Sequence, residues 1–150
     1  MKLHHIGIVV RDCEVYGEAY ARLLGLVAET ELFYDPIQKV RVQFWRDGEG
    51  SCIELIEPVG KDSPVWREAQ KGGGLNHLCY ETSDIEQTIK DSLREGAIAV
   101  RPIAPAIAFE GRRVAFLYFF ELGLIEFVET HNHVESPEPV LILERSAKAT

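Results

Sequence analysis

The chain has 150 residues, of which 46% are hydrophobic, and its net charge of −8 is spread along the sequence rather than gathered in a tail. This length supports one domain with a substantial core, whereas halves of about 70 residues would each be marginal alone. The acidic balance argues against a nucleic-acid backbone as partner, because such a partner requires a basic face.

The cysteines and the N-terminal residues indicate the cellular compartment of the protein. Cys13, Cys52 and Cys79 are odd in number and lack paired spacing, which is typical of buried thiols in a reducing compartment. The N-terminus lacks a signal-peptide pattern, and no apolar run is long enough to cross a membrane. We therefore expect a cytoplasmic protein with no membrane partner.

Residues 2–71 read as a strand, a helix, three strands and a short linking helix. Branched apolar residues predict the first strand over 3–10, and Asp12 and Gly25 mark the two ends of the helix. The short helix is expected from Ser63 to Gln70, with a proline at its first position. The three intervening strands are predicted over residues 26–34, 40–45 and 52–57.

Residues 72–130 repeat this order. After a strand over 75–82, Ser83 and Glu86 form a capping box for a helix that ends at Gly96. The last three strands are expected over residues 98–101, 113–119 and 124–129. The tail over 131–150 lies outside the repeat and is not assigned to any element.

The two halves align without a gap at an offset of 72 residues, which predicts an internal duplication. At this offset His5 falls on His77 and Glu54 falls on Glu126. Both histidine-to-glutamate steps are 49 residues long (54 − 5 and 126 − 77). Scattered surface charges have no reason to repeat in register, so we expect each copy to give one imidazole and one carboxylate to a shared site.

The four residues, His5, Glu54, His77 and Glu126, have apolar or small neighbours on their own strand faces. A lone carboxylate would be costly to bury there, whereas a divalent cation would neutralise the two carboxylates. This ligand set suits octahedral Mn²⁺, Co²⁺, Ni²⁺, Fe²⁺ or Zn²⁺ and does not select among them. Strand alternation predicts that His4 points to the opposite face, and that Glu57 and Glu129 are solvated.

The paired modules resemble the vicinal oxygen chelate superfamily, which includes glyoxalase I, bleomycin-resistance proteins and extradiol dioxygenases, and within it the methylmalonyl-CoA epimerases. The stretches that carry the resemblance are Leu3-His4-His5-Ile6-Gly7-Ile8-Val9-Val10, Gln38-Lys39-Val40, Ile53-Glu54-Leu55-Ile56-Glu57-Pro58, Asp62-Ser63-Pro64, Gly74-Leu75-Asn76-His77-Leu78 and Leu124-Ile125-Glu126-Phe127. The resemblance implies an α+β fold of two βαβββ modules in a cup-shaped mixed sheet. It also implies His5, Glu54, His77 and Glu126 as metal ligands, a small-molecule substrate such as an acyl-CoA thioester, and a homodimer.

The epimerases and glyoxalases of this superfamily move a proton next to a carbonyl group, so the resemblance to the epimerases implies a metal-dependent epimerase or isomerase. Some epimerases carry a glutamate base on the third strand, where this chain has Val42. Glu126 or Glu54 is therefore the expected base. Two alternatives stay open at this point. One is a glyoxalase-type lyase acting on a thiol adduct of a 2-oxoaldehyde, and the other is a non-catalytic protein that binds a drug or metabolite in the same cup.

Overall fold

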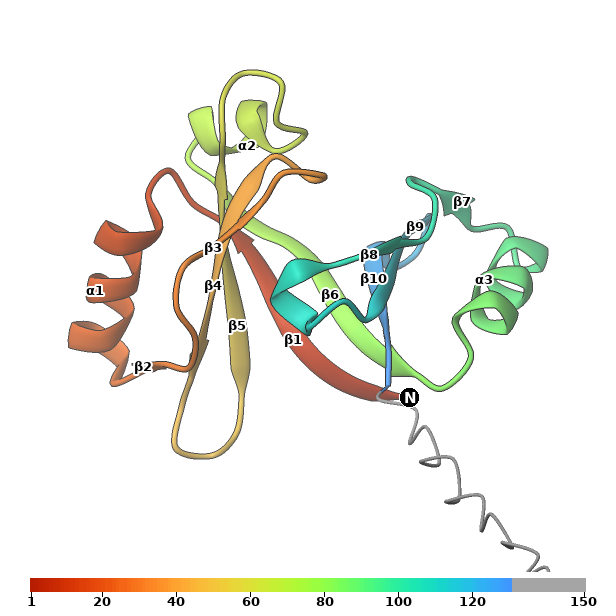
Figure 1. Cartoon of the computed structure of the whole chain (residues 1–150), viewed down its shortest axis with the longest axis horizontal. Coiled ribbons are helices and arrows are strands. Elements are labelled where there is room, and N and C mark those ends of the chain that lie inside the picture. The colour runs from red at the N-terminus through yellow and green to blue at the C-terminus, as the bar shows by residue number, and fades with distance from the viewer. Residues whose placement is uncertain (131–150) are drawn as a thin grey trace, which may run out of the picture.

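The computed structural model describes residues 1–130, and the tail over 131–150 lies outside this range. Each half contains one long helix and a run of strands, in the order expected from the sequence (Figure 1). The elements are β1 (Lys2–Val9), α1 (Cys13–Leu24), β2 (Val27–Ala28), β3 (Phe33–Asp35), β4 (Val40–Arg46), β5 (Cys52–Pro58), α2 (Trp66–Gln70), β6 (Gly74–Thr82), α3 (Ile85–Arg94), β7 (Ile98–Ala99), β8 (Ala104–Pro105), the 3-10 helix η1 (Ile107–Phe109), β9 (Arg113–Phe119) and β10 (Gly123–Glu129).

The strands form one mixed sheet of ten strands within residues 1–130, in the order β2-β4-β5-β1-β6-β10-β9-β7. In addition, β3 pairs with β4 and β8 pairs with β9. The two first strands, β1 and β6, run antiparallel at the centre, and each pairs in parallel with the last strand of its own half. This symmetric order supports our proposed division into copies over 2–71 and 72–130.

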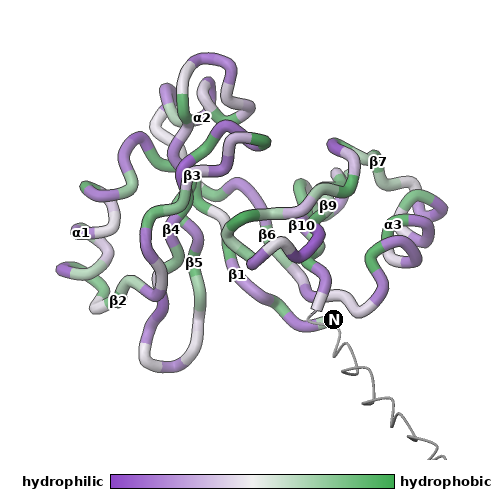
Figure 2. Tube along the Cα trace, viewed as in Figure 1, coloured by the Kyte–Doolittle hydropathy of each residue, from purple (hydrophilic) through white to green (hydrophobic). Residues whose placement is uncertain are grey.

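The long helices cover the two flanks of the sheet (Figure 1). On α3, hydrophobic residues face β9 and β10 while hydrophilic residues face away from the sheet (Figure 2). On α1, Cys13 and Gly17 are the buried positions, and the half-buried Tyr16 and Tyr20 pack beside them against the core. A Cβ on Gly17 would lie 2.2 Å from the Trp45 ring, so the absence of a side chain lets helix and sheet approach closely.

Ion pairs at repeat-related positions link the outer strands. Arg41 on β4 binds Glu57 on β5, and Arg113 on β9 binds Glu129 on β10. Glu57 is buried and also accepts a hydrogen bond of 2.9 Å from the backbone N–H of Cys13, at the start of α1. The expectation that Glu57 and Glu129 are solvated was therefore wrong, because each has an arginine partner on the neighbouring strand.

Four local expectations also differ from the structure. The strand expected over 26–34 is divided into β2 and β3, because the Thr30 hydroxyl accepts from the backbone N–H of Phe44 and interrupts the ladder. The linking helix begins at Trp66 rather than at Ser63. The N-cap of α3 is Asp84, whose carboxylate accepts from the backbone N–H of Gln87, rather than Ser83. The strand expected over 98–101 is limited to β7.

Candidate metal centre

The four side chains singled out by the repeat lie on the four central strands and meet at one point. His5 is on β1, Glu54 on β5, His77 on β6 and Glu126 on β10, and all four are buried. The two Nε2 atoms of His5 and His77 lie 3.2 Å apart. Glu126 Oε2 is 3.3 Å from the first of these nitrogens and 3.1 Å from the second. Glu54 Oε2 is 3.2 Å and 3.5 Å from the same two atoms.

Strand register explains why these four side chains converge. In the parallel pairs, Glu54 lies beside Gly7 and Glu126 lies beside Cys79. Gly7 and Cys79 are equivalent positions of the two copies. In the antiparallel centre, Gly7 lies opposite His77. A Cβ on Gly7 would be only 2.2 Å from Cε1 of His77, so the imidazole occupies the space that a side chain would fill.

The spacing and chemistry of the donors fit a divalent cation. With metal–ligand bonds of about 2.1 Å, neighbouring ligand atoms lie about 3.0 Å apart in an octahedron and about 3.4 Å apart in a tetrahedron. The separations involving the two Nε2 atoms, 3.1 to 3.5 Å, lie close to these values. Glu126 Oε2 is buried and has no hydrogen-bond donor among residues 1–130. It is therefore an acceptor aimed at a position where a cation would satisfy it.

The electrostatics of the cluster favour positive charge between the carboxylates. Burial works to lower the pKa of His5, but Glu54 and Glu126 together raise it to about 9. Burial works to raise the pKa of Glu126, but the adjacent imidazoles hold it well below its usual range. Two ionised carboxylates with neutral imidazoles would carry a charge of −2, which a divalent cation balances.

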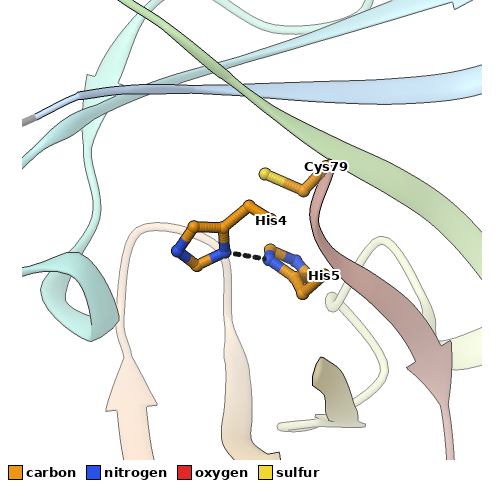
Figure 3. A group of neighbouring side chains, drawn as sticks. All are labelled: His4, His5 and Cys79. Carbon is orange, nitrogen blue, oxygen red and sulfur yellow. Dashed lines mark hydrogen bonds between the residues drawn. The ribbon is translucent and has the colours of Figure 1, made fainter. Parts of the chain in front are cut away.

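Each histidine also has a partner for its other ring nitrogen. His77 Nδ1 lies 2.8 Å from Asn76 Oδ1, and His5 Nδ1 lies 2.8 Å from Nδ1 of His4. The prediction that His4 points to the opposite face was wrong, since its ring meets that of His5 (Figure 3). Burial and the neighbouring His5 lower the pKa of His4 to about 4, so the ring is neutral at pH 7.

A second donor group, His4, His5 and Cys79, lies beside the first, with its ligand atoms within 4.8 Å of one another (Figure 3). It shares His5 with the main cluster. Burial raises the pKa of the Cys79 thiol strongly, with a smaller contribution from Glu126, so the thiol stays protonated. Because a metal requires the thiolate, the four-residue cluster is the better candidate for a cation site.

A cavity of about 220 Å³ opens next to the cluster, and Glu54, His77 and Glu126 form part of its wall. Val42, Phe109, Phe116 and Leu124 contribute apolar surface. Arg101 lines the same cavity, is half-buried, and forms no hydrogen bond or ion pair within residues 1–130. Arg101 could not be predicted from the sequence, because it follows a two-residue strand in an irregular, proline-containing segment.

Within residues 1–130, the structure contains no helix with the length and apolar character needed to span a membrane.

Comparison with known proteins gives consistent results. The family model described as the glyoxalase/bleomycin resistance protein/dioxygenase superfamily matches residues 4–116. An ethylmalonyl-CoA/methylmalonyl-CoA epimerase from Cereibacter sphaeroides is 36% identical over 121 residues, which cover 78% of this chain and 87% of the relative. The mitochondrial methylmalonyl-CoA epimerase of Homo sapiens is 31% identical, with 81% of this chain and 69% of the relative covered.

A solved structure shows the same arrangement of elements. It is a variant of the Streptomyces coelicolor methylmalonyl-CoA epimerase in complex with 2-nitronate-propionyl-CoA. It superimposes with a TM-score of 0.74 at 25% identity, covering 88% of this chain and 99% of that one. The chain therefore belongs to the glyoxalase/bleomycin resistance protein/dioxygenase superfamily.

Proposed function

We propose that this chain is a metal-dependent epimerase that moves the α-proton of a 2-carboxyacyl-CoA thioester such as methylmalonyl-CoA. In this proposal His5, Glu54, His77 and Glu126 are the metal ligands. The observation that carries it is the convergence of two buried imidazoles and two buried carboxylates at the wall of a cavity. The relatives at 36% and 31% identity are named as epimerases of such thioesters, which supports the choice of reaction.

A bound Co²⁺, Mn²⁺, Ni²⁺, Fe²⁺ or Zn²⁺ would supply Lewis-acid stabilisation of the negative charge that develops on the substrate's carbonyl oxygen, on the order of several kcal/mol. The chain's own contribution is to hold the thioester next to a carboxylate that takes the proton. General-base catalysis of this kind typically contributes roughly 10²- to 10⁴-fold to the rate.

The candidates for the base are the carboxylates that line the cavity. Their hydrogen-bond partners distinguish the carboxylates with structural roles from those that could accept a proton. Asp35 accepts two backbone N–H groups in a turn, and Glu68 accepts from the Asn76 amide, so both have structural roles. In the described part of the chain, Glu54 and Glu126 have no such partners, and both lie within the cluster. We propose that Glu126 moves out of the ligand set and acts as the base, because its Oε2 has no hydrogen-bond donor within residues 1–130 to hold it in place. Glu54 is the alternative.

The cavity also favours a particular substrate. Its volume of about 220 Å³ lies below the roughly 300–1,000 Å³ of pockets that enclose drug-sized ligands. It would therefore take the acyl end of a thioester and leave the CoA portion outside. Arg101 offers in the wall a guanidinium that has no partner among residues 1–130, which suits the free carboxylate of a 2-carboxyacyl group. A 2-oxoaldehyde adduct has no carboxylate at that position, so this feature favours the epimerase over the glyoxalase reaction.

The test is exchange of the substrate's α-proton with solvent. The Co²⁺-loaded protein is incubated in heavy water with methylmalonyl-CoA, and separately with the hemithioacetal of methylglyoxal and glutathione. We expect enzyme-dependent deuterium uptake at the α-carbon of the thioester, and its loss in Glu126→Gln but not in the exposed control Glu49→Gln. Unchanged uptake in Glu126→Gln would assign the base elsewhere, and turnover of the hemithioacetal alone would support a lyase.

We also propose a homodimer, as the family resemblance implies, and a reducing compartment such as the cytoplasm, as the cysteine usage indicates. Multi-angle light scattering of the purified chain measures the dimer directly.

A further inference from the structure

The first central strand contains one extra residue just before a proposed metal ligand. Along β1 the pairing with β6 advances from Leu3 to His5, while β6 moves only from Tyr80 to Cys79. Two residues on β1 therefore oppose one on β6. This β-bulge makes His4 the extra residue.

The second central strand contains the same feature. Here β6 moves from His77 to Leu75 while β1 advances only from Gly7 to Ile8. The extra residue is Asn76, which again stands directly before a proposed ligand. Residues 4 and 76 are separated by 72 positions (76 − 4), the offset of the internal repeat.

These bulges redirect two side chains. In a straight strand, neighbouring side chains point to opposite faces, so neither His4 nor Asn76 could reach the residue that follows it. Bulges next to active sites are known to re-aim side chains. Here each extra residue lies 2.8 Å from Nδ1 of the next histidine, on both strands.

In the second copy the proton positions follow from the hydrogen bonds. Asn76 Nδ2 lies 2.8 Å from Glu68 Oε2, and a carboxylate there can only accept. The amide nitrogen therefore faces Glu68, and Oδ1 faces His77. Because Oδ1 is also only an acceptor, His77 Nδ1 carries the proton, and its Nε2 lone pair points into the cluster.

In the first copy the proton position on His5 follows from its role as a metal ligand. A ligating Nε2 carries no proton, so neutral His5 carries its proton on Nδ1 and donates it to Nδ1 of His4. The His4 ring is fixed in place because it packs edge-on against Phe109, with ring centroids 5.4 Å apart, and against Phe44.

We propose that His4 and Asn76 are paired positioning residues, each accepting the Nδ1–H of the adjacent metal ligand and aiming that ligand's Nε2 at the cation. This inference rests on the proposed metal site, but it is independent of the substrate and of the reaction. Partners of this kind typically change metal affinity by about 10- to 100-fold.

The first experiment needs no variant. In the ¹⁵N-labelled wild-type chain loaded with Zn²⁺, a through-hydrogen-bond nitrogen–nitrogen correlation is expected between Nδ1 of His5 and Nδ1 of His4. The Nδ1 protons of His5 and His77 should exchange slowly with water. Absence of the correlation, or a proton on Nε2 of His5, would overturn the proposal.

The second experiment measures Co²⁺ affinity by competition with a chelating dye. His4→Leu and Asn76→Leu remove the acceptors, while His4→Asn installs the residue that the second copy uses. Leu3→Ala, a partly exposed neighbour on β1, is the matched control. Far-UV circular dichroism in the presence of a chelator checks that each variant is folded.

We expect both leucine variants to bind Co²⁺ about 10- to 100-fold more weakly, and His4→Asn and Leu3→Ala to stay within about threefold of wild type. Wild-type affinity in His4→Leu would overturn the proposal, as would equal losses in His4→Leu and His4→Asn, since packing would then be the cause. If His4→Leu does not fold, the nitrogen–nitrogen correlation in the wild-type chain still tests the proposal. A wild-type chain that binds neither ion would instead refute the metal site of the proposed function.

Discussion

The substitution Gly7→Ala tests whether His77 is held in place by the missing side chain of the neighbouring strand. The new Cβ would stand 2.2 Å from Cε1, 2.5 Å from Nδ1 and 2.6 Å from Nε2 of His77. Ordinary contact begins at 3.4 Å, so the ring must move by about 1.2 Å. Metal–ligand bonds tolerate shifts of only about 0.2 Å. We therefore expect loss of His77 as a ligand and at least about 100-fold weaker Co²⁺ binding.

The assay is Co²⁺ titration together with thermal unfolding in the presence of a chelator. Overpacking of this kind typically lowers the free energy of unfolding by about 1–3 kcal/mol, so the midpoint temperature of unfolding should fall. Gly48→Ala is the matched control, because nothing lies within 4 Å of its Cβ. In a His77→Ala background, Gly7→Ala should no longer lower the midpoint, since the clashing ring is gone. Wild-type Co²⁺ affinity and stability in Gly7→Ala would refute this reasoning.

Two further predictions concern the cavity and the thiols. Arg101→Leu should raise KM for methylmalonyl-CoA by about 10- to 100-fold, because a charge-assisted hydrogen bond is worth about 1.5–3 kcal/mol. Co²⁺ affinity and inhibition by an acyl-CoA without the second carboxylate should be unchanged, and an equal loss for both thioesters would argue against carboxylate recognition. Burial raises the pKa of Cys13 to about 12 and of Cys52 to about 11, and Cys79 is shifted in the same direction. Since the thiolate is the reactive form, the folded chain at pH 8 should resist a disulfide-based thiol reagent that labels all three cysteines after denaturation. Rapid labelling of the folded chain would contradict this.

The sequence predicted the convergence of the four proposed ligands because the duplication constrains it. A gap-free repeat places equivalent residues on equivalent strands, and pairing of the two first strands then brings both copies together. The contact of His4 with His5 could not be predicted in the same way. It depends on one extra residue in the strand pairing, and a bulge leaves no mark in the pattern of polar and apolar residues.

The helix α1 shows a similar limit. The helical spacing of Val15, Ala19, Leu23 and Leu24 predicts a helix, and a helix forms. Ala19 is half-buried, yet the side chains of Val15, Leu23 and Leu24 are more than 60% exposed. The face that packs against the sheet is instead the one with Cys13, Tyr16, Gly17 and Tyr20, and Gly17 allows the helix to approach Trp45. Periodicity therefore predicted the helix but not the face that it buries, since the close approach at Gly17 could not be read from the pattern.

The central claim is that one divalent cation is bound by the four side chains of the duplicated strands. Anomalous diffraction from crystals of the Co²⁺-loaded chain measures this most directly. The account predicts one cobalt peak per chain, bound by Nε2 of both histidines and by the carboxylates of Glu54 and Glu126. A peak beside His4 and Cys79, or no peak near the cluster, would contradict it.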